Sequence, residues 1–578
     1  MPKLTLPSWT RNKWVWLGLA LVALVAWTAL CHIQWLHGDP TLHGVPAFFL
    51  GVGVEIILFA LARTVLGTIR GGWRWLFTRA ALRAPLWSML FFISVLVLFY
   101  SVERWRGKRA WAAVVREAKQ LGEPLSPDAL ARAPVPDDQN FARAPLFAPL
   151  LSEKVENNSV EAQRWEAIER VERHTVHDLP LAVWLNQTNT NLRACLKVYY
   201  KHQAGAPTSE VQAAEALVKE FQAFDSTLEQ VRSASTRPYC QWPMDLRRPW
   251  LLDVPQRRAV LSLVHILRYR ASAELALAKQ EAAFADIQLA LRLLGAGWQK
   301  PPQASPWLPL YDQNLEGLLD AIQPLWEGLC AHAWNAEQLA KLQQQFESLP
   351  VLENYPAAVR SDALTMATLV ETLVPTSGRA AAPDWDVSPE DEFGLNLARW
   401  FYPVGWSLQD QAAIHQFHFE STALLVDPAT KRLNPMQRIS PKPLFASSDP
   451  LFPVFMTPRI RQMAQESREL FPLAQSAVDQ AMLACALERF RLDQGHYPDA
   501  TAELVPKYVS KLPADVINGQ SLKYIRLEDQ RFLLYSVGLN MSDDHAQPPP
   551  RSLDWRGRPQ RRPEWEKGDW VWLYPTSK

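Results

Sequence analysis

The sequence is poor in glycine and in cysteine. Its 578 residues include 23 glycines, or 4.0%, against a usual share of about 7%. Tight hairpin turns need glycine, so a chain built from successive β-hairpins is excluded. Five cysteines in 65.7 kDa exclude a disulfide-dense fold. Hydrophobic residues make up 48% of the chain and charged residues 21%, which excludes a disordered chain or a fibre.

The local motifs of common catalytic sites are also missing. The chain has no HExxH, no GxSxG, no P-loop and no GxGxxG beside a predicted strand. His174 and His177, and likewise His415 and His418, can each bring two imidazoles onto one helical face, and Glu420 follows the second pair. Two ligands do not make a zinc site, so we interpret these histidines as solvated or locally bonded. We therefore predict no catalytic, cofactor-binding or metal-ligating residue and no cofactor.

Charge is unevenly distributed along the chain. Residues 1–120 hold 14 Lys+Arg and 4 Asp+Glu, whereas the remainder holds 46 and 55. A basic front end on a mildly acidic body indicates a membrane-facing N-terminus rather than a nucleic-acid partner. Proline is plentiful, with 45 residues or 7.8% against about 5%, which suits helices joined by stiff loops.

Three apolar stretches in residues 1–102 are predicted to be transmembrane helices. They cover 14–36, 45–62 and 84–102, and about 20 apolar residues suffice to span a bilayer core. The middle stretch carries Glu55 near its centre. We favour a protonated Glu55 that faces the other two helices, or a helix that does not fully cross the membrane, and the alternative is a proton or ion site.

The Lys/Arg bias predicts the orientation of these helices. Lys3, Arg11 and Lys13 precede the first span, and five arginines lie between residues 63 and 83. Both regions are thus predicted to lie inside, with everything after residue 103 outside. Four basic residues just after the third span oppose this, but long domains translocate largely regardless of such charges. We expect a multi-pass bacterial inner-membrane protein whose large C-terminal region is periplasmic or otherwise extracytoplasmic.

The rest of the chain is predicted to be mainly helical. A juxtamembrane helix and a proline-rich strap occupy 103–158, and an irregular helical body follows over 159–456. Ser209 and Asn335 are expected helix caps. Apolar residues recur at helical spacing, without a surviving 34-residue repeat, in five predicted helices: 209–232, 255–278, 281–295, 309–332 and 336–348.

The last part of the chain is predicted to be a small α+β module over 457–544 and a tail over 545–578. A long helix begins at Thr457 and ends before Gly495, and residues 522–527 and 531–537 are predicted to form a hairpin. The tail contains four tryptophans among arginines, a pattern that can bind single-stranded nucleic acid. Its acidic residues dilute the positive charge, so we interpret the tail as packing onto its own domain: Trp555, Trp565, Trp570 and Trp572.

The stretch from about Ala477 to Asp544 resembles the periplasmic region of the major pseudopilin of type II secretion. The match covers roughly 70 residues, and the order of its elements is more specific than any one of them. The matching positions are Leu487-Glu488-Arg489-Phe490, Gly495, Tyr497-Pro498, Leu504, Pro506, Leu512-Pro513, Asp515, Gly519, Tyr524, Tyr535-Ser536 and Gly538.

The departures from that family are informative. Here 456 residues precede the helix, no prepilin-peptidase site adjoins it, and His545 follows Asp543 and Asp544 where glycines are expected. We therefore carry over neither the family's calcium site nor polymerisation. The whole chain also resembles uncharacterised bacterial membrane-anchored proteins with a helical extracytoplasmic body and a pseudopilin-like tail. The positions that carry this are 122–125, 134–140, 144–147, 285–286 and 331–334.

The predicted function is that of a membrane-anchored envelope scaffold, and a non-enzymatic role is favoured. Its expected partners are the lipid bilayer and other envelope proteins. It would be accessory to a secretion or pilus-like assembly. One alternative is an extracytoplasmic hydrolase with its site in the helical body, and another is an ion-coupled membrane component centred on Glu55. Cys195 and Cys240 can pair if the body is periplasmic, although buried free thiols are the default interpretation.

Overall fold

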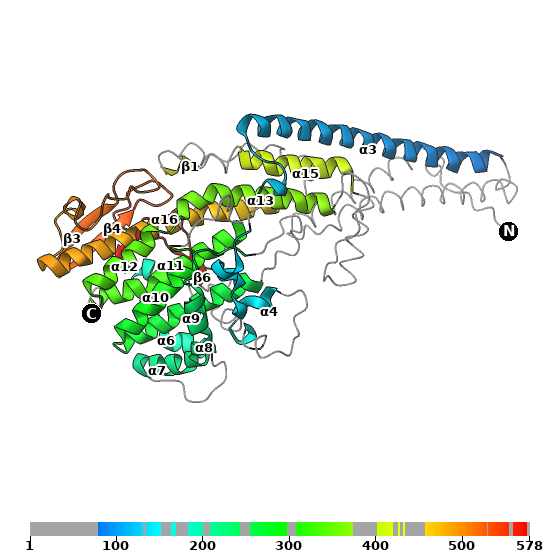
Figure 1. The fold of residues 1–578 in the computed structure, drawn as a ribbon. Coiled ribbons are helices and arrows are strands. Elements are labelled where there is room, and N and C mark those ends of the chain that lie inside the picture. The colour runs from blue at the N-terminus through cyan, green and yellow to red at the C-terminus, as the bar shows by residue number, and fades with distance from the viewer. Residues whose placement is uncertain are drawn as a thin grey trace, which may run out of the picture. The chain divides into compact units, whose positions relative to one another are not determined.

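The protein is described here from a computed structural model, which is mainly helical with a small antiparallel sheet of three strands, as the sequence predicts at that level (Figure 1). The predicted spans 14–36 and 45–62, with Glu55, lie outside the described residues. The structure describes residues 79–130, 134–151, 163, 165–168, 183–199, 209–242, 255–297, 308–373, 402–419, 426–427, 432–433, 457–528, 530–553 and 559–574.

The chain divides into two compact units, each assembled from separated stretches of sequence. The first comprises Met1–Leu125, Met366–Gln416 and Lys442–Ile460. The second comprises Ser126–Thr365, Phe417–Pro441 and Arg461–Lys578.

The main described elements of the first unit are helices α3 (Arg79–Leu121) and α15 (Val404–Phe417), the latter extending one residue beyond it. α3 is one uninterrupted helix of 43 residues, so the predicted span 84–102 and the predicted juxtamembrane helix form a single rod (Figure 1). From residue 89 to residue 102 no side chain of α3 is buried. The next residue, Glu103, is fully buried, and one turn earlier Phe99 packs against Trp406 of α15 with ring centroids 5.9 Å apart.

The remaining helices form most of the body. Their predicted caps are confirmed, because the Ser209 and Asn335 side chains accept from the backbone N–H groups of Gln212 and Gln338. The predicted helix 209–232 is instead two helices separated by one turn of 3₁₀ helix. The helices are α4 (Ala148–Leu151), α6 (Leu192–Tyr199), α7 (Glu210–Phe221), α8 (Asp225–Ala234), α9 (Pro255–Ala276), α10 (Gln280–Leu293), α11 (Leu308–Cys330), α12 (Ala336–Glu347), α13 (Val351–Leu373) and α16 (Thr457–Gln494).

Helix α9 is the centre of the body. Helices α7, α10 and α11 all pack against it (Figure 1), and every residue from Ala259 to Glu274 is buried. A helix enclosed on all sides is normally apolar throughout, but this one carries arginine, histidine, serine and glutamate. Those polar residues need partners inside the protein.

Helix α16 is as apolar as a membrane span but is enclosed by protein. Among the described helices, Leu470–Gln494 is the one stretch long and apolar enough to cross a membrane, and 89% of its apolar window is buried. From residue 470 to residue 487 all side chains are buried except Gln475 and Asp479, which are half-buried. Gly495 ends the helix with a φ of +81°, as expected for a glycine C′ residue.

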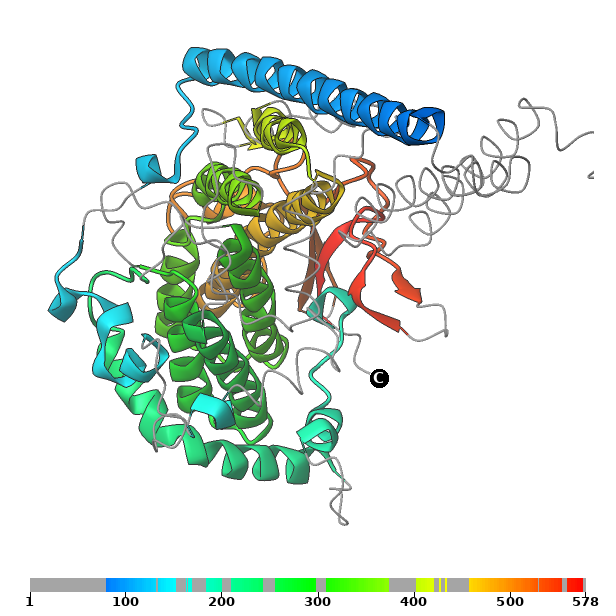
Figure 2. The same cartoon turned by 90° about the vertical axis from the view of Figure 1, so that its right-hand side faces the viewer.

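The sheet contains the predicted hairpin and one further strand (Figure 2). β3 (Lys523–Leu527) pairs with β4 (Arg531–Ser536), and β4 pairs with β7 (Trp570–Leu573), all antiparallel. Strand β7 comes from the tail, and its tryptophans Trp570 and Trp572 are completely buried. The described part of the tail therefore packs on its own domain. Two short ladders pair β1 (Val426–Asp427) with β2 (Arg432–Leu433), and β5 (Arg551–Leu553) with β6 (Pro559–Pro563).

The C-terminal module shares one hydrophobic core with the helical body. The side chain of Gln343 on α12 donates to the Tyr508 carbonyl at 2.9 Å, and Trp184 packs 5.2 Å from Trp572 between ring centroids. His332, just after α11, bonds the fully buried carboxylate of Glu488 at 2.9 Å. The module is thus built into the second unit and is not an appended domain.

Candidate functional site

Polar residues, all of them buried except the half-buried Glu327, line the contact between α9 and α11, and we call them the polar ladder. On α9 the members are His265, Arg268 and Ser272, spaced i, i+3 and i+7, which places them on one face. On α11 they have the same spacing: Asp320, Gln323 and Glu327. Each α11 member is 55 positions after its α9 counterpart, and we call each such pair a rung. The three rungs therefore follow one another in the same order along both helices.

Two of the rungs are connected by measured contacts. His265 Nε2 lies 3.4 Å from Asp320 Oδ2. At the other end, Thr190 links the helices: its hydroxyl is 3.3 Å from the Ser272 hydroxyl, and its N–H donates to Glu327 at 2.6 Å. Polar groups at both ends of the ladder therefore have polar partners, as buried polar groups require.

The middle of the ladder holds an arginine with incomplete hydrogen bonding. Arg268 is 97% buried and its Nε has no hydrogen-bond partner. Its guanidinium lies 4.1 Å from the Tyr269 ring centre. Burial opposes the charge, but the surrounding negative groups, Asp320 and Glu327 among them, outweigh burial and raise the pKa of Arg268. Arg268 is thus a permanent buried cation balanced by nearby carboxylates rather than by direct ion pairs.

The thiol nearest this arginine is not a nucleophile at neutral pH. Cys195 on α6 is buried, and burial raises the pKa of its thiol to about 12 despite the attraction of Arg268. His265 Nδ1 has no hydrogen-bond partner, so no hydroxyl or thiol is positioned for His265 to activate. The ladder contains a His–Asp pair but lacks an activated nucleophile at it.

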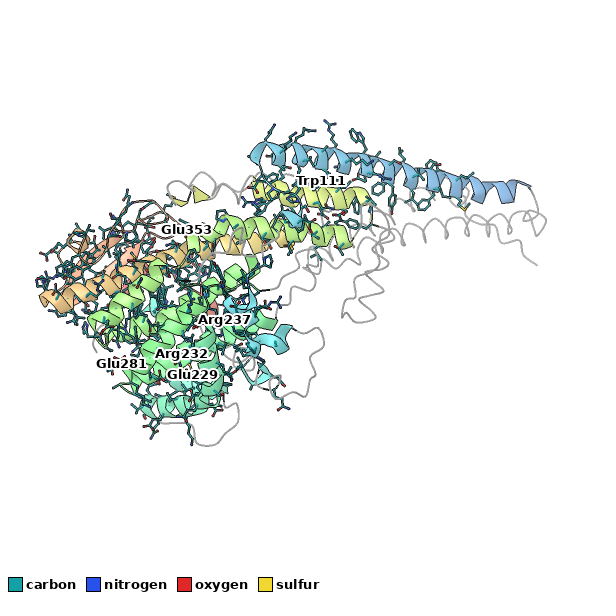
Figure 3. All side chains as sticks on the ribbon, in the orientation of Figure 1. Trp111, Glu229, Arg232, Arg237, Glu281 and Glu353 are labelled. Carbon is teal, nitrogen blue, oxygen red and sulfur yellow. The ribbon has the colours of Figure 1, made fainter. Side chains whose placement is uncertain are left out.

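A second cluster of charge lies on another face of α9, and we call it the Arg270 cluster. The Arg270 guanidinium binds the buried Asp286 of α10 through two nitrogens, at 2.5 and 2.6 Å, and binds Asp225 of α8 at 2.7 Å. Arg232, which Figure 3 shows beside Glu229, reaches Asp286 at 3.4 Å. These contacts connect three helices, so the cluster fixes their relative positions.

Glu274 is the member of this cluster whose carboxyl group can gain or lose a proton near neutral pH. One carboxylate oxygen is 3.9 Å from Arg270 Nε, and the other, Oε2, is buried without a hydrogen-bond partner. Burial, with the negative charge of Asp286, raises the pKa of Glu274 to about 7. A carboxyl group that titrates near neutrality inside a protein is typical of functional sites and also of structural charge networks.

In the first unit, α3 and α15 meet at a junction of glycines around a buried carboxylate. Glu103 accepts from Trp406 Nε1 and Gln409 Nε2, each at 3.0 Å. A Cβ built on Gly405 would lie 2.1 Å from the Glu103 carbonyl oxygen, so only glycine allows the two backbones to approach this closely. Farther along, Trp111 of α3 lies beside the His415 ring of α15 at 5.8 Å (Figure 3).

The histidine pairs singled out in the sequence do not form a metal site in the described residues. His415 and His418 are both buried, whereas His174, His177 and Glu420 lie outside the described residues. No group of three or more His, Cys, Asp or Glu side chains is arranged to hold a metal anywhere in the described ranges. The four described cysteines are free thiols, so Cys195 and Cys240 do not pair, and Cys31 is not described.

The acidic loop after β4 is organised by the protein itself. Asp543 accepts from the Tyr535 hydroxyl at 3.0 Å and from the His545 N–H at 3.1 Å. Asp569 accepts from the N–H groups of Ala546 at 2.7 Å and Asp544 at 3.3 Å. The sequence did not anticipate Asp569, because it lies 25 residues beyond the loop that it closes.

Sequence reasoning missed the polar ladder and the Arg270 cluster. The available signal was a set of polar residues at i, i+3 and i+7 inside two long apolar helices. Sequence comparison adds no relative: no family model, no curated protein and no solved structure matches this chain.

Proposed function

We propose that the protein is a multi-pass membrane-anchored scaffold of the bacterial envelope, with its large C-terminal part outside the cytoplasm. The observation that carries this proposal is residues 89–102 of α3, which are mostly apolar and include no buried side chain. Phe91 is 73% exposed and Leu98 is 64% exposed. A contiguous apolar surface of this kind is unfavourable in water and indicates a lipid or protein environment.

The two serines of this segment support a lipid environment. The hydroxyl of Ser94 donates to the Leu90 carbonyl at 2.8 Å, and that of Ser101 donates to the Val97 carbonyl at 2.6 Å. Each hydroxyl is thus satisfied within its own helix. Hydrocarbon offers no other partner, so such back-bonding is what a spanning helix requires.

The continuity of α3 supports a role in positioning. Its apolar half passes without a break into the half that docks α15 through Gly107, Gly405 and Glu103. A rigid helix held by a close backbone contact would fix the first unit at a set height above the membrane. The scaffold would present its helical surfaces to other envelope proteins from that position.

The likeness to pseudopilins supports a contact with a secretion or pilus-like assembly. A long helix packed on a small antiparallel sheet accords with this likeness. The faces of that helix from residue 470 to 487 are buried by this chain itself, so we assign the contact to the edge strand β3. Ile525 on β3 is 47% exposed.

Membrane anchoring is tested by one charged residue in the full chain. Leu98→Arg places a cation in the apolar half of α3, where it costs about 2.5–3.5 kcal/mol near a helix centre. Because two further spans are predicted, we expect this variant to stay in carbonate-washed membranes without α3 crossing, so that a C-terminal reporter lies on the opposite side from that of the wild type. The matched control is Val115→Arg on the same helix, 42% exposed beyond the span, which should keep the wild-type topology. The same reporter position in both variants contradicts the anchor.

The scaffold contact is tested by in-cell cross-linking and affinity purification of the full chain. Deleting the module would expose the shared core, so the variant of choice is Ile525→Asp. Loss of secretion or pilus-like components with this variant, and not with Val211→Asp at another exposed position on α7, supports the proposal. Recovery of unrelated proteins only would refute it.

An extracytoplasmic hydrolase is the second candidate function, and the His265–Asp320 pair with the neutral-range Glu274 favours it. An activity on ester, peptide or glycoside substrates that follows one ionisation near pH 7, and that Glu274→Gln abolishes in a folded protein, would support an enzyme. Activity unchanged in that variant would remove Glu274 from the mechanism.

A further inference from the structure

Helix α3 carries a basic face immediately beyond its apolar half. The face is exposed, and acidic side chains are absent from it in the described helix. Trp105 is 61% exposed among these cations, and the Arg109 guanidinium lies 5.6 Å from its ring centre. The cations are Arg104, Lys108, Arg109, Arg116 and Lys119.

This face is turned away from α15. The contacts with α15 include Phe99, Glu103, Gly107 and Trp111, spaced four apart on one side of the helix. Arg104 and Lys108 are each one position later, about 100° around the helix axis. Docking of α15 therefore leaves the basic face open.

The unbroken helix sets the height of each cation above the apolar half. At about 1.5 Å per residue, Arg104 lies about 3 Å and Arg109 about 10 Å beyond Val102. Arg116 and Lys119 lie about 21 and 26 Å beyond it. The polar head-group region is about 5–8 Å deep on each side of a bilayer, and electrostatic attraction falls off over about 8 Å at physiological salt.

We propose that Arg104, Trp105, Lys108 and Arg109 form a collar that binds the phosphodiester head groups of anionic phospholipids. The inference rests on the proposed anchoring by α3. Guanidinium groups match phosphate oxygens through paired N–H donors, and tryptophan prefers the membrane interface. Stacking of Arg109 on Trp105 holds the cation in place for that contact. A nucleic-acid phosphate is disfavoured because the collar directly adjoins an exposed apolar surface.

The test uses the full chain reconstituted into vesicles of equal phosphatidylglycerol and phosphatidylcholine content. Lipids retained by the purified protein are then quantified by mass spectrometry. We expect enrichment of phosphatidylglycerol that decreases with salt. Each basic residue near the surface contributes about fivefold, so Arg104→Gln/Lys108→Gln/Arg109→Gln should lower the enrichment at least tenfold.

The chain supplies a matched control in the distal cations. Arg116→Gln/Lys119→Gln removes charge from the same face beyond the head groups and should change the enrichment by less than twofold. An unchanged triple variant, or an equal loss in the distal variant, overturns the collar. If the protein inserts without lipid preference, only the collar proposal is refuted. If it does not enter vesicles at all, the proposed anchoring is refuted as well.

Discussion

Two apolar helical segments of this protein have nearly opposite surroundings. Residues 89–102 of α3 have no buried side chain, whereas residues 470–487 of α16 are buried on almost every side. The first is rich in Leu, Val and Phe, and the second is rich in Leu and Ala. The first is part of a predicted bilayer span, and the second passes the length and composition test for one. The difference teaches that the environment of an apolar helix is decided by the surfaces that the rest of the chain supplies.

The largest expected effect tests this contrast directly. Leu473→Ala in α16 removes a completely buried side chain and should lower the free energy of unfolding by about 2–5 kcal/mol. Leu98→Ala in α3 removes an exposed side chain and should leave the stability of the body unchanged. Chemical denaturation in detergent, followed by circular dichroism, measures both. Similar losses would mean that residues 89–102 are covered by protein.

The second prediction concerns the buried carboxylate at the end of α16. Burial would raise the pKa of Glu488, but hydrogen bonds from His332, Arg491 and Tyr497 outweigh it and lower the pKa to about 2. The folded pKa is below the ordinary 4.5, so this stabilisation is present above pH 4.5 and is lost as the pH falls toward 2.

The stabilisation that comes from the lowered pKa of Glu488 amounts to about 3 kcal/mol. Glu488→Gln should therefore remove most of the loss of stability between pH 4.5 and pH 2, and should destabilise the protein at pH 7. Acid titration of the wild type and the variant measures this. The same acid dependence in both would exclude Glu488 as its source.

The third prediction concerns the junction that follows the apolar half of α3. Alanine in place of glycine usually stabilises a helix by about 1 kcal/mol. At Gly405 the added Cβ would lie 2.1 Å from a backbone oxygen, so Gly405→Ala should instead cost about 1–3 kcal/mol. Hydrogen exchange of residues 404–417 should accelerate. In the control Gly317→Ala, flexible ends of leucine side chains are the neighbours and a smaller effect is expected.

The smallest expected effect concerns the buried carboxyl group of Glu274 on α9, a second enclosed helix. Burial raises the pKa of Glu274 to about 7, above its ordinary 4.5, so the folded state favours the protonated form. Stability from this source is complete below pH 4.5 and is lost as the pH rises through 7. Full ionisation corresponds to about 3 kcal/mol, but the variant also loses the attraction between the ionised carboxylate and Arg270. Glu274→Gln should therefore be neutral at pH 4 and stabilising by about 1–2 kcal/mol at pH 8. Denaturation at the two pH values checks the sign, and a destabilised variant at pH 8 would contradict it.

Local features of the fold were predictable wherever the residues that cause them are close together in the sequence. The caps at Ser209 and Asn335, the stop at Gly495 and the β3–β4 hairpin all depend on neighbours within a few residues. The split of 209–232 into two helices was missed because its apolar periodicity continues through the break.

The buried polar networks were much less predictable. The His265–Asp320 contact joins residues 55 positions apart, and the His332–Glu488 contact joins residues 156 positions apart. A polar residue in an apolar helix signals that a partner exists, but not which residue it is. The metal and catalytic motifs absent from the sequence gave no guide to these clusters.

The sequence by itself determined a mainly helical chain and, to within two residues, the bounds of α9, α10, α11, α12 and α16, because these follow from local periodicity and capping. Only the tertiary structure decided that α16 is enclosed, that the tail supplies β7 and that the cations of α9 have carboxylate neighbours. Burial and ion pairing depend on the distance between surfaces, and only the folded chain sets that distance.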